Sequence, residues 1–266
     1  MSQAEYEAGV ATIRDDIARG WVYQVNLCRV LTAALSVPIN LEALYFALRR
    51  HNPAPHAGYL HIPEHNIDIA SASPELFLSR SGDQIKSSPI KGTAKQASEL
   101  LAKDSSENIM IVDLVRNDLS HACIKGSVNV EHLLRLEEHP GLVHLVSDVV
   151  GQVSKDISWA DILTATSPPG SVSGAPKSSA LETITRIEKS PRDIYCGAFG
   201  WVDGTNKTAS LAVGIRTFWQ TQSSEGAQLK FGTGAGITWE SDPHGEWLET
   251  ELKAHHLLNI AAGIIK

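Results

Sequence analysis

Several lysine and carboxylate side chains stand at positions where they could act on a substrate. Lys91 lies in SSPIKGTA, residues 87–94, where Pro89 and Gly92 indicate the end of a strand that runs into a loop. An amine in such a place could be a solvated surface charge, a phosphate anchor or, with a lowered pKa, a nucleophile. The neighbouring residues leave these three interpretations open.

Acidic residues near the C-terminus could offer oxygen ligands to a metal ion. In EWLETELK, Glu246, Glu249 and Lys253 are three and four residues apart, which puts them on one face of a helix. Two carboxylates on one face could bind a hard cation such as Mg²⁺. A solvated face with internal ion pairs explains the same spacing and is the simpler interpretation.

Two further carboxylates also have a functional and a structural interpretation. Glu107 begins the apolar stretch ENIMIVDL, and a carboxylate on the buried side of a helix is costly unless it is paired or bound to a metal. It could equally be a first-turn residue that the helix dipole favours. Glu75, in ASPELFL, could be a general acid or a solvated loop residue.

Glycine-rich segments could bind an anion through their backbone. FGTGAGI, residues 231–237, lacks the spacing of a dinucleotide fingerprint, but its N–H groups could surround a carboxylate or phosphate; the alternative is a bulge or a tight bend. SPPGSVSGAPK, residues 167–177, is not a P-loop, because Pro176 separates its second glycine from the lysine. It could still lead into an anion-binding helix N-terminus or a plain capped helix. Together with Arg216, this inventory fits Mg²⁺ and a substrate that carries carboxylates.

The composition excludes several classes of protein. The chain has 266 residues and a net charge of −7, with acidic and basic residues interspersed, so no basic surface for nucleic acid is expected. Its three cysteines are widely spaced, which fits a reducing compartment and neither a disulfide framework nor a zinc knuckle. No apolar stretch is long enough to cross a membrane, and the N-terminus does not resemble a secretory signal. We therefore expect a cytoplasmic protein.

The elements that must position these residues are helices inserted between hairpins. We predict strands over 21–31, 127–139, 142–153, 193–202, 209–219 and 227–239, and an antiparallel meander over 57–90. We predict helices over 6–17, 41–50, 94–119, 158–166 and 175–189, and from Pro243 to the end. Strands mostly neighbour strands, so the fold class is α+β, and we expect one domain.

The motifs together resemble a specific family, the chorismate-utilising enzymes, which include anthranilate, aminodeoxychorismate, isochorismate and salicylate synthases. The matching stretches run in family order over nearly the whole chain: YQVNLCR, SPELFL, PIKGT, ENIMIVDLVRNDL, HLVS, GSVSGAPK, GIRT, GTGAGI and EWLETELK. The resemblance implies two stacked, mainly antiparallel sheets with helices outside. It also implies that residues 1–266 are a chorismate-binding catalytic domain that lacks the family's N-terminal region.

The resemblance also implies a role for each matching residue. Glu107 and Glu246 would hold Mg²⁺, with Glu249 in support, and Mg²⁺ would bind the C1 carboxylate of chorismate. The other implied substrate contacts are Gly234, Gly236 and Lys253 around that carboxylate, Tyr195 and Arg216 on the enolpyruvyl carboxylate, His144 and Thr93 against the ring, and Gln24 and Ser171 elsewhere in the site. Glu75 would protonate the departing C4 hydroxyl, so Lys91, Glu75 and His144 form the expected catalytic set.

Two positions distinguish the members of the family. Isochorismate and salicylate synthases carry a lysine base where this chain has Gln24, so those activities are not expected. Anthranilate synthases typically read PIAGT where this chain reads PIKGT, which favours aminodeoxychorismate synthase component I with Lys91 as the nucleophile at C2. Ammonia from a glutamine amidotransferase partner would then attack C4, in para-aminobenzoate and folate synthesis. Anthranilate synthase, or a silent chain that only binds a partner, stays as the alternative.

Overall fold

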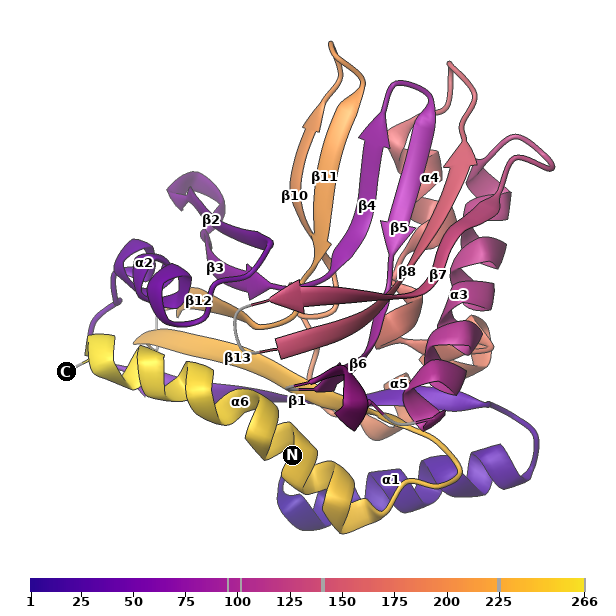
Figure 1. Cartoon of the computed structure of the whole chain (residues 1–266). Helices are drawn as coiled ribbons and strands as arrows, with labels where there is room; N and C mark the ends of the chain where they lie inside the picture. Colours follow the sequence, from indigo (N-terminus) through magenta and orange to yellow (C-terminus); the bar gives the residue numbers. More distant parts are fainter. Residues whose placement is uncertain (95, 101, 140–141, 224–225, 266) are drawn as a thin grey trace. The chain divides into compact units, whose positions relative to one another are not determined.

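The computed structural model describes residues 1–94, 96–100, 102–139, 142–223 and 226–265 (Figure 1). They group into two compact units. The first unit comprises residues 1–74, 178–197 and those from 214 to the C-terminus, and the second comprises 75–177 and 198–213. Each contains helices and a mainly antiparallel sheet, so the predicted α+β class is confirmed. The expectation that one domain spans the chain stays a prediction.

The sheet of the first unit runs in the order β2-β3-β12-β13-β1, and every neighbouring pair is antiparallel. The bounds are β1 (Gln24–Leu35), β2 (His56–Ile62), β3 (Ile67–Ser73), β12 (Thr217–Ser223) and β13 (Gly226–Ile237). β1 begins with six consecutive buried residues and pairs with β13 from Val25 opposite Ile237 to Leu35 opposite Ala227. It is the longest strand pairing described in this unit.

Amphipathic helices cover this sheet. They are α1 (Gln3–Ala18), α2 (Leu41–His51), α5 (Lys177–Ile187, whose first residue belongs to the second unit) and α6 (Pro243–Ile265). In α1, a Ser2 capping box starts the helix, and Tyr6, Val10 and Ile13 are buried at helical spacing in one core cluster with β1. Figure 1 shows α6 running along β13, where Leu257 joins a second cluster.

The second unit has a seven-stranded sheet in the order β10-β11-β4-β5-β8-β6, with β7 paired to β8. The bounds are β4 (Leu76–Ser81), β5 (Gln84–Ser88), β6 (Ile90–Ala94), β7 (Asn129–His139), β8 (Leu142–Gln152), β10 (Ala198–Asp203) and β11 (Thr208–Val213), with a short β9 at Gly174–Ala175. The helices are α3 (Ala102–Ala122) and α4 (Trp159–Thr166). The predicted strand pair of β7 and β8 is confirmed; residues 140–141 between them lie outside the described residues.

The segment that carries Lys91 is a strand, so the prediction of a loop there was wrong. β5 and β6 both pair with β8, at successive positions along it, with Ser87 opposite Val149 and Ile90 opposite Val146. Pro89 lacks an N–H and interrupts the strand, but its carbonyl still accepts a hydrogen bond from the Ser147 N–H at 3.2 Å. The register then shifts between Ile90 and Thr93, so Lys91 lies at a β-bulge. Bulges re-aim side chains, and they are common beside active sites.

The chain changes sheets at two places where the sequence predicted continuous strands. The predicted meander divides at Pro74, since β3 pairs with β2 and β12, whereas β4 pairs with β5 and β11. The predicted strand over 209–219 divides at Gly214–Arg216, where Arg216 has a left-handed φ of 53°. Hydrophobic alternation is the same on both sides of such breaks, so periodicity alone could not locate them.

Two further boundaries differ from the prediction. Helix α3 begins at Ala102 instead of residue 94, because β6 and a short 3₁₀ turn occupy the residues before it. Strand β10 begins at Ala198 instead of residue 193, since the preceding residues form turns in which Asp193 and Cys196 have positive φ. None of the helices in the described ranges is both long and apolar enough to cross a membrane.

Candidate active site

Glu75 is the first residue of the second unit and precedes β4. It is only 5% exposed, so the interpretation as a solvated loop residue was wrong. Burial raises the pKa of Glu75 to about 7, and the Ser171 hydroxyl, the Lys91 charge and the Ile90 N–H oppose this rise. A carboxyl group with such a pKa keeps its proton up to neutral pH, as a general acid must.

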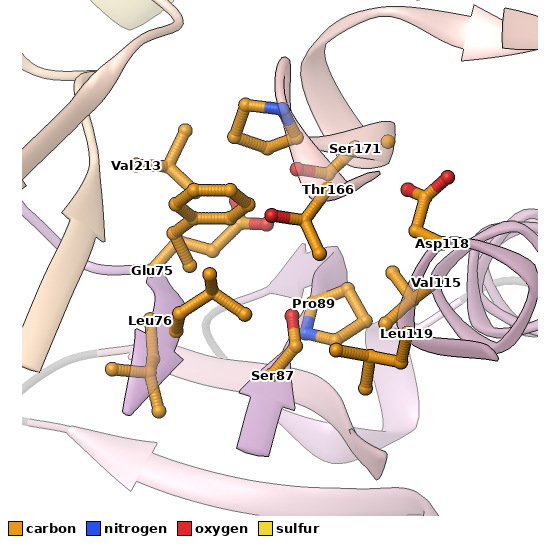
Figure 2. A pocket seen from close by; sticks show the side chains of 14 residues that line it. Glu75, Leu76, Ser87, Pro89, Val115, Asp118, Leu119, Thr166, Ser171 and Val213 are labelled. Carbon is orange, nitrogen blue, oxygen red and sulfur yellow. The ribbon is translucent and has the colours of Figure 1, made fainter. Parts of the chain in front are cut away.

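Glu75 lines a pocket within the second unit (Figure 2). The pocket holds about 310 Å³ of empty space, part of it open to solvent, and its walls come from β4, α3 and the segment after α4. Figure 2 shows polar groups of Thr166, Ser171 and Asp118 among the apolar side chains of this wall. The buried Ser171 hydroxyl acts on the Glu75 carboxyl group and has no hydrogen-bond partner among the other described residues.

The bulge in β6 determines how Lys91 is presented. Lys91 is half-buried, and its charge acts on Glu75. Gly92 follows with a φ of 90°, and a Cβ atom there would lie 2.8 Å from Cβ of Asp104. Only glycine tolerates both conditions, so the glycine of PIKGT serves the backbone turn that places Lys91.

Thr93 and His144 also come together in this sheet. They are register partners on β6 and β8, and Thr93 Oγ1 lies 2.9 Å from Nδ1 of His144. His144 is 7% exposed. The hydrogen bond fixes the orientation of the imidazole, whereas which nitrogen carries the proton depends on the tautomer.

Glu107 lies in the second turn of α3, so its interpretation as a first-turn residue was wrong. It is half-buried, and Ile111, one turn later on the same face, is fully buried. The next residue, Asn108, ties the helix to β8 by donating to the Leu145 carbonyl at 3.0 Å. The role of Glu107 as a metal ligand stays a prediction.

In the first unit, Lys253 of α6 lies at the edge of β13. Its Nζ donates to the Gly234 carbonyl at 3.0 Å and lies 2.6 Å from Oε1 of Glu249. In an antiparallel strand the N–H and C=O of one residue point to the same side, so the Gly234 N–H also faces this edge, as do those of Gly232 and Gly236 two residues away. The described pairing of β13 with β12 ends at Phe231, before these glycines. The alternative interpretation of this segment as a bulge is not supported by the pairing of β13 with β1, which is regular.

Glu246 and Glu249 stand one turn apart on α6, and their oxygens suit a hard cation. Glu246 is 7% exposed and accepts a hydrogen bond from Ser241 Oγ at 2.6 Å, whereas Glu249 is exposed. A buried carboxylate beside an exposed one fits a metal site that a substrate can reach, so these residues are suited to Mg²⁺. Magnesium binding by them stays a prediction.

Tyr195, Arg216 and Gln24 also belong to the first unit. A Cβ atom at Gly232 would lie 2.1 Å from Cγ of Tyr195, so the tyrosine ring packs directly on the strand backbone. Burial raises the pKa of Tyr195. Burial also lowers the pKa of Arg216, and the interaction with Tyr195 opposes this decrease. Gln24 is 1% exposed, and neither polar atom of its side chain has a hydrogen-bond partner in the described structure. An unsatisfied buried amide is costly, which suits a position that meets a polar ligand.

The sequence analysis missed one buried ion pair, in which Lys177 Nζ lies 2.6 Å from Oδ2 of Asp118. Asp118 lines the same pocket as Glu75, and burial raises its pKa to about 6 against the opposing charge of Lys177. A signal was present, because Asp118 is eleven residues after Glu107, three helical turns on the same apolar face of α3.

The chain belongs to the family of chorismate binding enzymes, whose profile matches residues 1–259. It is 34% identical to anthranilate synthase component 1 of Saccharolobus solfataricus over 95% of this chain and 61% of that protein. It is 40% identical to the aminodeoxychorismate synthase of Streptomyces pristinaespiralis over 97% of this chain and 36% of that protein. The chain therefore spans less than two thirds of the length of each of these relatives.

A solved structure has the same fold. The chain superposes on anthranilate synthase component I of Streptococcus pneumoniae with a TM-score of 0.84 and 30% identity, over 97% of this chain and 58% of that one. Because relatives with both names match at similar identity, similarity alone does not separate the two reactions.

Proposed function

We propose that this chain aminates chorismate at C4 to give 4-amino-4-deoxychorismate, the reaction of aminodeoxychorismate synthase. The observation that carries the proposal is that the charge of Lys91, at the bulge of β6, acts on the buried Glu75, whose pKa is about 7. An amine and a protonated carboxyl group in one site can act as nucleophile and general acid in one step. The name of the relative at 40% identity supports the same reaction.

Chorismate would bind through its two carboxylates. The Gly234 and Gly236 backbone and Lys253 suit the C1 carboxylate, while Tyr195 and Arg216 suit the enolpyruvyl carboxylate, since the planar guanidinium fork pairs with two oxygens. Glu107, Glu246 and Glu249 would hold Mg²⁺, which would neutralise and orient the C1 carboxylate. Thr93 holds His144 in place at 2.9 Å, and both would lie against the ring.

The first step would form a covalent intermediate. The neutral amine of Lys91 attacks C2, the two conjugated ring double bonds shift from C1=C2 and C5=C6 to C1=C6 and C4=C5, and the C4–O bond breaks as Glu75 gives its proton to the hydroxyl, which leaves as water. The added amine then carries a surplus proton, and the Glu75 carboxylate, left without its own, can accept it. Glu75 must enter the step protonated, so the rate would fall as the pH rises above about 7.

The second step would restore the lysine. Ammonia attacks C4, both double bonds shift back to C1=C2 and C5=C6, and the C2–N bond breaks as the Lys91 amine takes up the surplus proton of the added ammonia. The net reaction converts chorismate and ammonia into 4-amino-4-deoxychorismate and water. Gln24 stands where a base for activating water would be needed, and an amide cannot act as one. We infer that a glutamine amidotransferase partner supplies the ammonia, for para-aminobenzoate and folate synthesis.

Anthranilate synthase is the second candidate, favoured by relatives of that name at 34% identity. Incubation with chorismate, MgCl₂ and an ammonium salt, followed by mass spectrometry, separates the two. Aminodeoxychorismate retains the enolpyruvyl group, whereas anthranilate has lost pyruvate. Anthranilate as the main product would overturn the proposal, and failure to bind chorismate in calorimetry would favour a silent chain.

The role of Lys91 is tested in the same incubation. Lys91→Ala should lose C4 amination with ammonia, whereas the matched control Lys103→Ala, at an exposed position of α3, should keep the parental rate. Intact-protein mass spectrometry of the parent, without ammonia, should find an adduct of chorismate less one water. Product formation by Lys91→Ala at the parental rate would contradict the nucleophilic role.

A further inference from the structure

The ion pair of Lys177 and Asp118 stands outside the proposed mechanism, yet it borders the pocket of Glu75. The side chains of Lys177 and Asp118 are 17% and 8% exposed, and their charged atoms are 2.6 Å apart. Lys177 Nζ also donates to the Thr166 carbonyl at 3.1 Å. Burying two charges is costly, so a gain in folding stability does not by itself explain an ion pair in this position.

The hydrogen bond from Lys177 to Thr166 joins the two ends of a loop, and these two residues are here called its neck. Thr166 is the last residue of α4 and Lys177 the first of α5, so this bond joins the two ends of the loop of residues 167–176. Asp118 belongs to α3, so its ion pair fastens the neck of the loop to that helix. The ammonium group of Lys177, at one end of the loop, therefore binds both Thr166 at the other end and Asp118 on α3.

The interior of the loop is compact and packs on the same helix. The Ser173 hydroxyl donates to the Pro169 carbonyl at 3.0 Å. A Cβ atom at Gly170 would lie 2.8 Å from Cδ2 of Leu114 on α3, so the loop backbone approaches the helix as closely as only glycine allows. These contacts hold the loop backbone against α3.

The loop supplies one wall of the pocket that Glu75 lines. Pro169, Gly170 and Ser171 line the pocket from the loop, Thr166 lines it from the neck, and Asp118 lines it from α3. Figure 2 shows Ser171 and Thr166 on this wall, with Asp118 farther along it on α3. The buried Ser171 hydroxyl acts on the Glu75 carboxyl group. It has no hydrogen-bond partner among the other described residues.

We propose that Lys177 and Asp118 are positioning residues, which hold the loop of residues 167–176 closed over Glu75 and keep the Ser171 hydroxyl against its carboxyl group. The proposal rests on the proposed function, in which Glu75 is the general acid. Neither member of the pair touches the reacting atoms; each acts through the loop.

The loop has two opposite effects on the ionisation of Glu75. By excluding water it favours the protonated acid, and burial is the largest influence on the pKa of this group. Through Ser171 it favours the carboxylate, to a smaller extent. The other charges are Lys91, which acts on Glu75, and His121, which with Lys177 acts on Asp118. Opening the neck and removing only the hydroxyl should therefore move the pKa of Glu75 in opposite directions.

The test is a ¹³C NMR titration of the Glu75 carboxyl group in the full chain, assigned with Glu75→Gln. Lys177→Met should admit water and increase the ionisation constant of Glu75 by about tenfold or more, which is about one pH unit. Ser171→Ala should decrease that constant, and Lys177→Arg should restore the parental value. Lys155→Met, at an exposed position before α4, is the matched control and should leave the constant unchanged.

A second variant guards against unfolding. Lys177→Met leaves a buried carboxylate without its counter-charge, which destabilises the folded protein. Asp118→Asn/Lys177→Met removes both charges and should show the same increase in the ionisation constant. An unchanged ionisation constant of Glu75 in both folded variants would overturn the proposal. The ion pair would then have only the structural role of linking Lys177 to α3.

The kinetic readout distinguishes this proposal from the proposed function. In the pH profile of kcat, the fall on the basic side should move to lower pH in Lys177→Met, with a smaller change in KM. If the chain makes no aminated product, the proposed function fails, but the NMR titration still decides whether the ion pair controls Glu75. A moved titration without a moved rate profile would show that Glu75 is not the acid.

Discussion

Glu75→Gln should make the protein more stable at alkaline pH, although it removes the proposed acid. The folded-state pKa of Glu75 is raised from 4.5 to about 7, mainly by burial. Between these values the unfolded chain has lost the proton and the native chain retains it, so stability falls as the pH rises. Above pH 7 the native state carries a buried carboxylate at its full cost. Gln is of similar size and has no charge to bury.

The magnitude follows from the pKa difference. At 1.36 kcal/mol per pH unit, the shift from 4.5 to about 7 amounts to about 3 kcal/mol, of which about 2.5 kcal/mol falls between pH 5 and pH 8. The advantage of Glu75→Gln over the parent in unfolding free energy should therefore grow by about 2.5 kcal/mol across this interval. The intercept at low pH reports the neutral substitution alone.

The assay is urea unfolding at half-unit pH steps from 5 to 8, followed by far-ultraviolet circular dichroism. Glu240→Gln, which removes one carboxyl group from an exposed position, is the matched control for the change in net charge. A free-energy difference between Glu75→Gln and the parent that stays constant from pH 5 to pH 8 would refute the reasoning, because it would mean that Glu75 ionises normally in the native state.

Three further predictions concern activity, the metal and packing. With the concentration of neutral ammonia held constant across the pH profile, ionisation of Glu75 should stop any rise in the amination rate above about pH 7, and a rate that still rises to pH 9 would contradict its role as the acid. Glu246→Gln should raise the Mg²⁺ concentration for half-maximal activity at least about tenfold, and calorimetric Mg²⁺ titration should weaken equally, whereas an unchanged requirement would remove Glu246 from the metal site. Gly232→Ala should cost about 1–3 kcal/mol in thermal unfolding, since its Cβ would lie 2.1 Å from the Tyr195 ring. Gly263→Ala, with open space around its Cβ, should not destabilise the protein.

The sequence by itself determined the inventory of chemical groups and the main helices. Periodicity located α1, since Tyr6, Val10 and Ile13 must share a face, and the predicted helix over 41–50 agrees with α2. The family resemblance predicts a place for Lys91 in a substrate site, whereas spacing alone left this lysine as a surface charge. These properties are local, so they can be read along the chain.

Tertiary structure decided how the groups behave. The same alternating pattern continues across Pro74 and Gly214, so only strand pairing shows that the chain changes sheets there. The bulge at Lys91 depends on the register with β8, and the pKa of Glu75 depends on water that distant residues exclude. Lys177 and Asp118 are fifty-nine residues apart, and only folding brings them to 2.6 Å. Register, burial and long-range ion pairs are relations between segments, which is why no single stretch of sequence contains them.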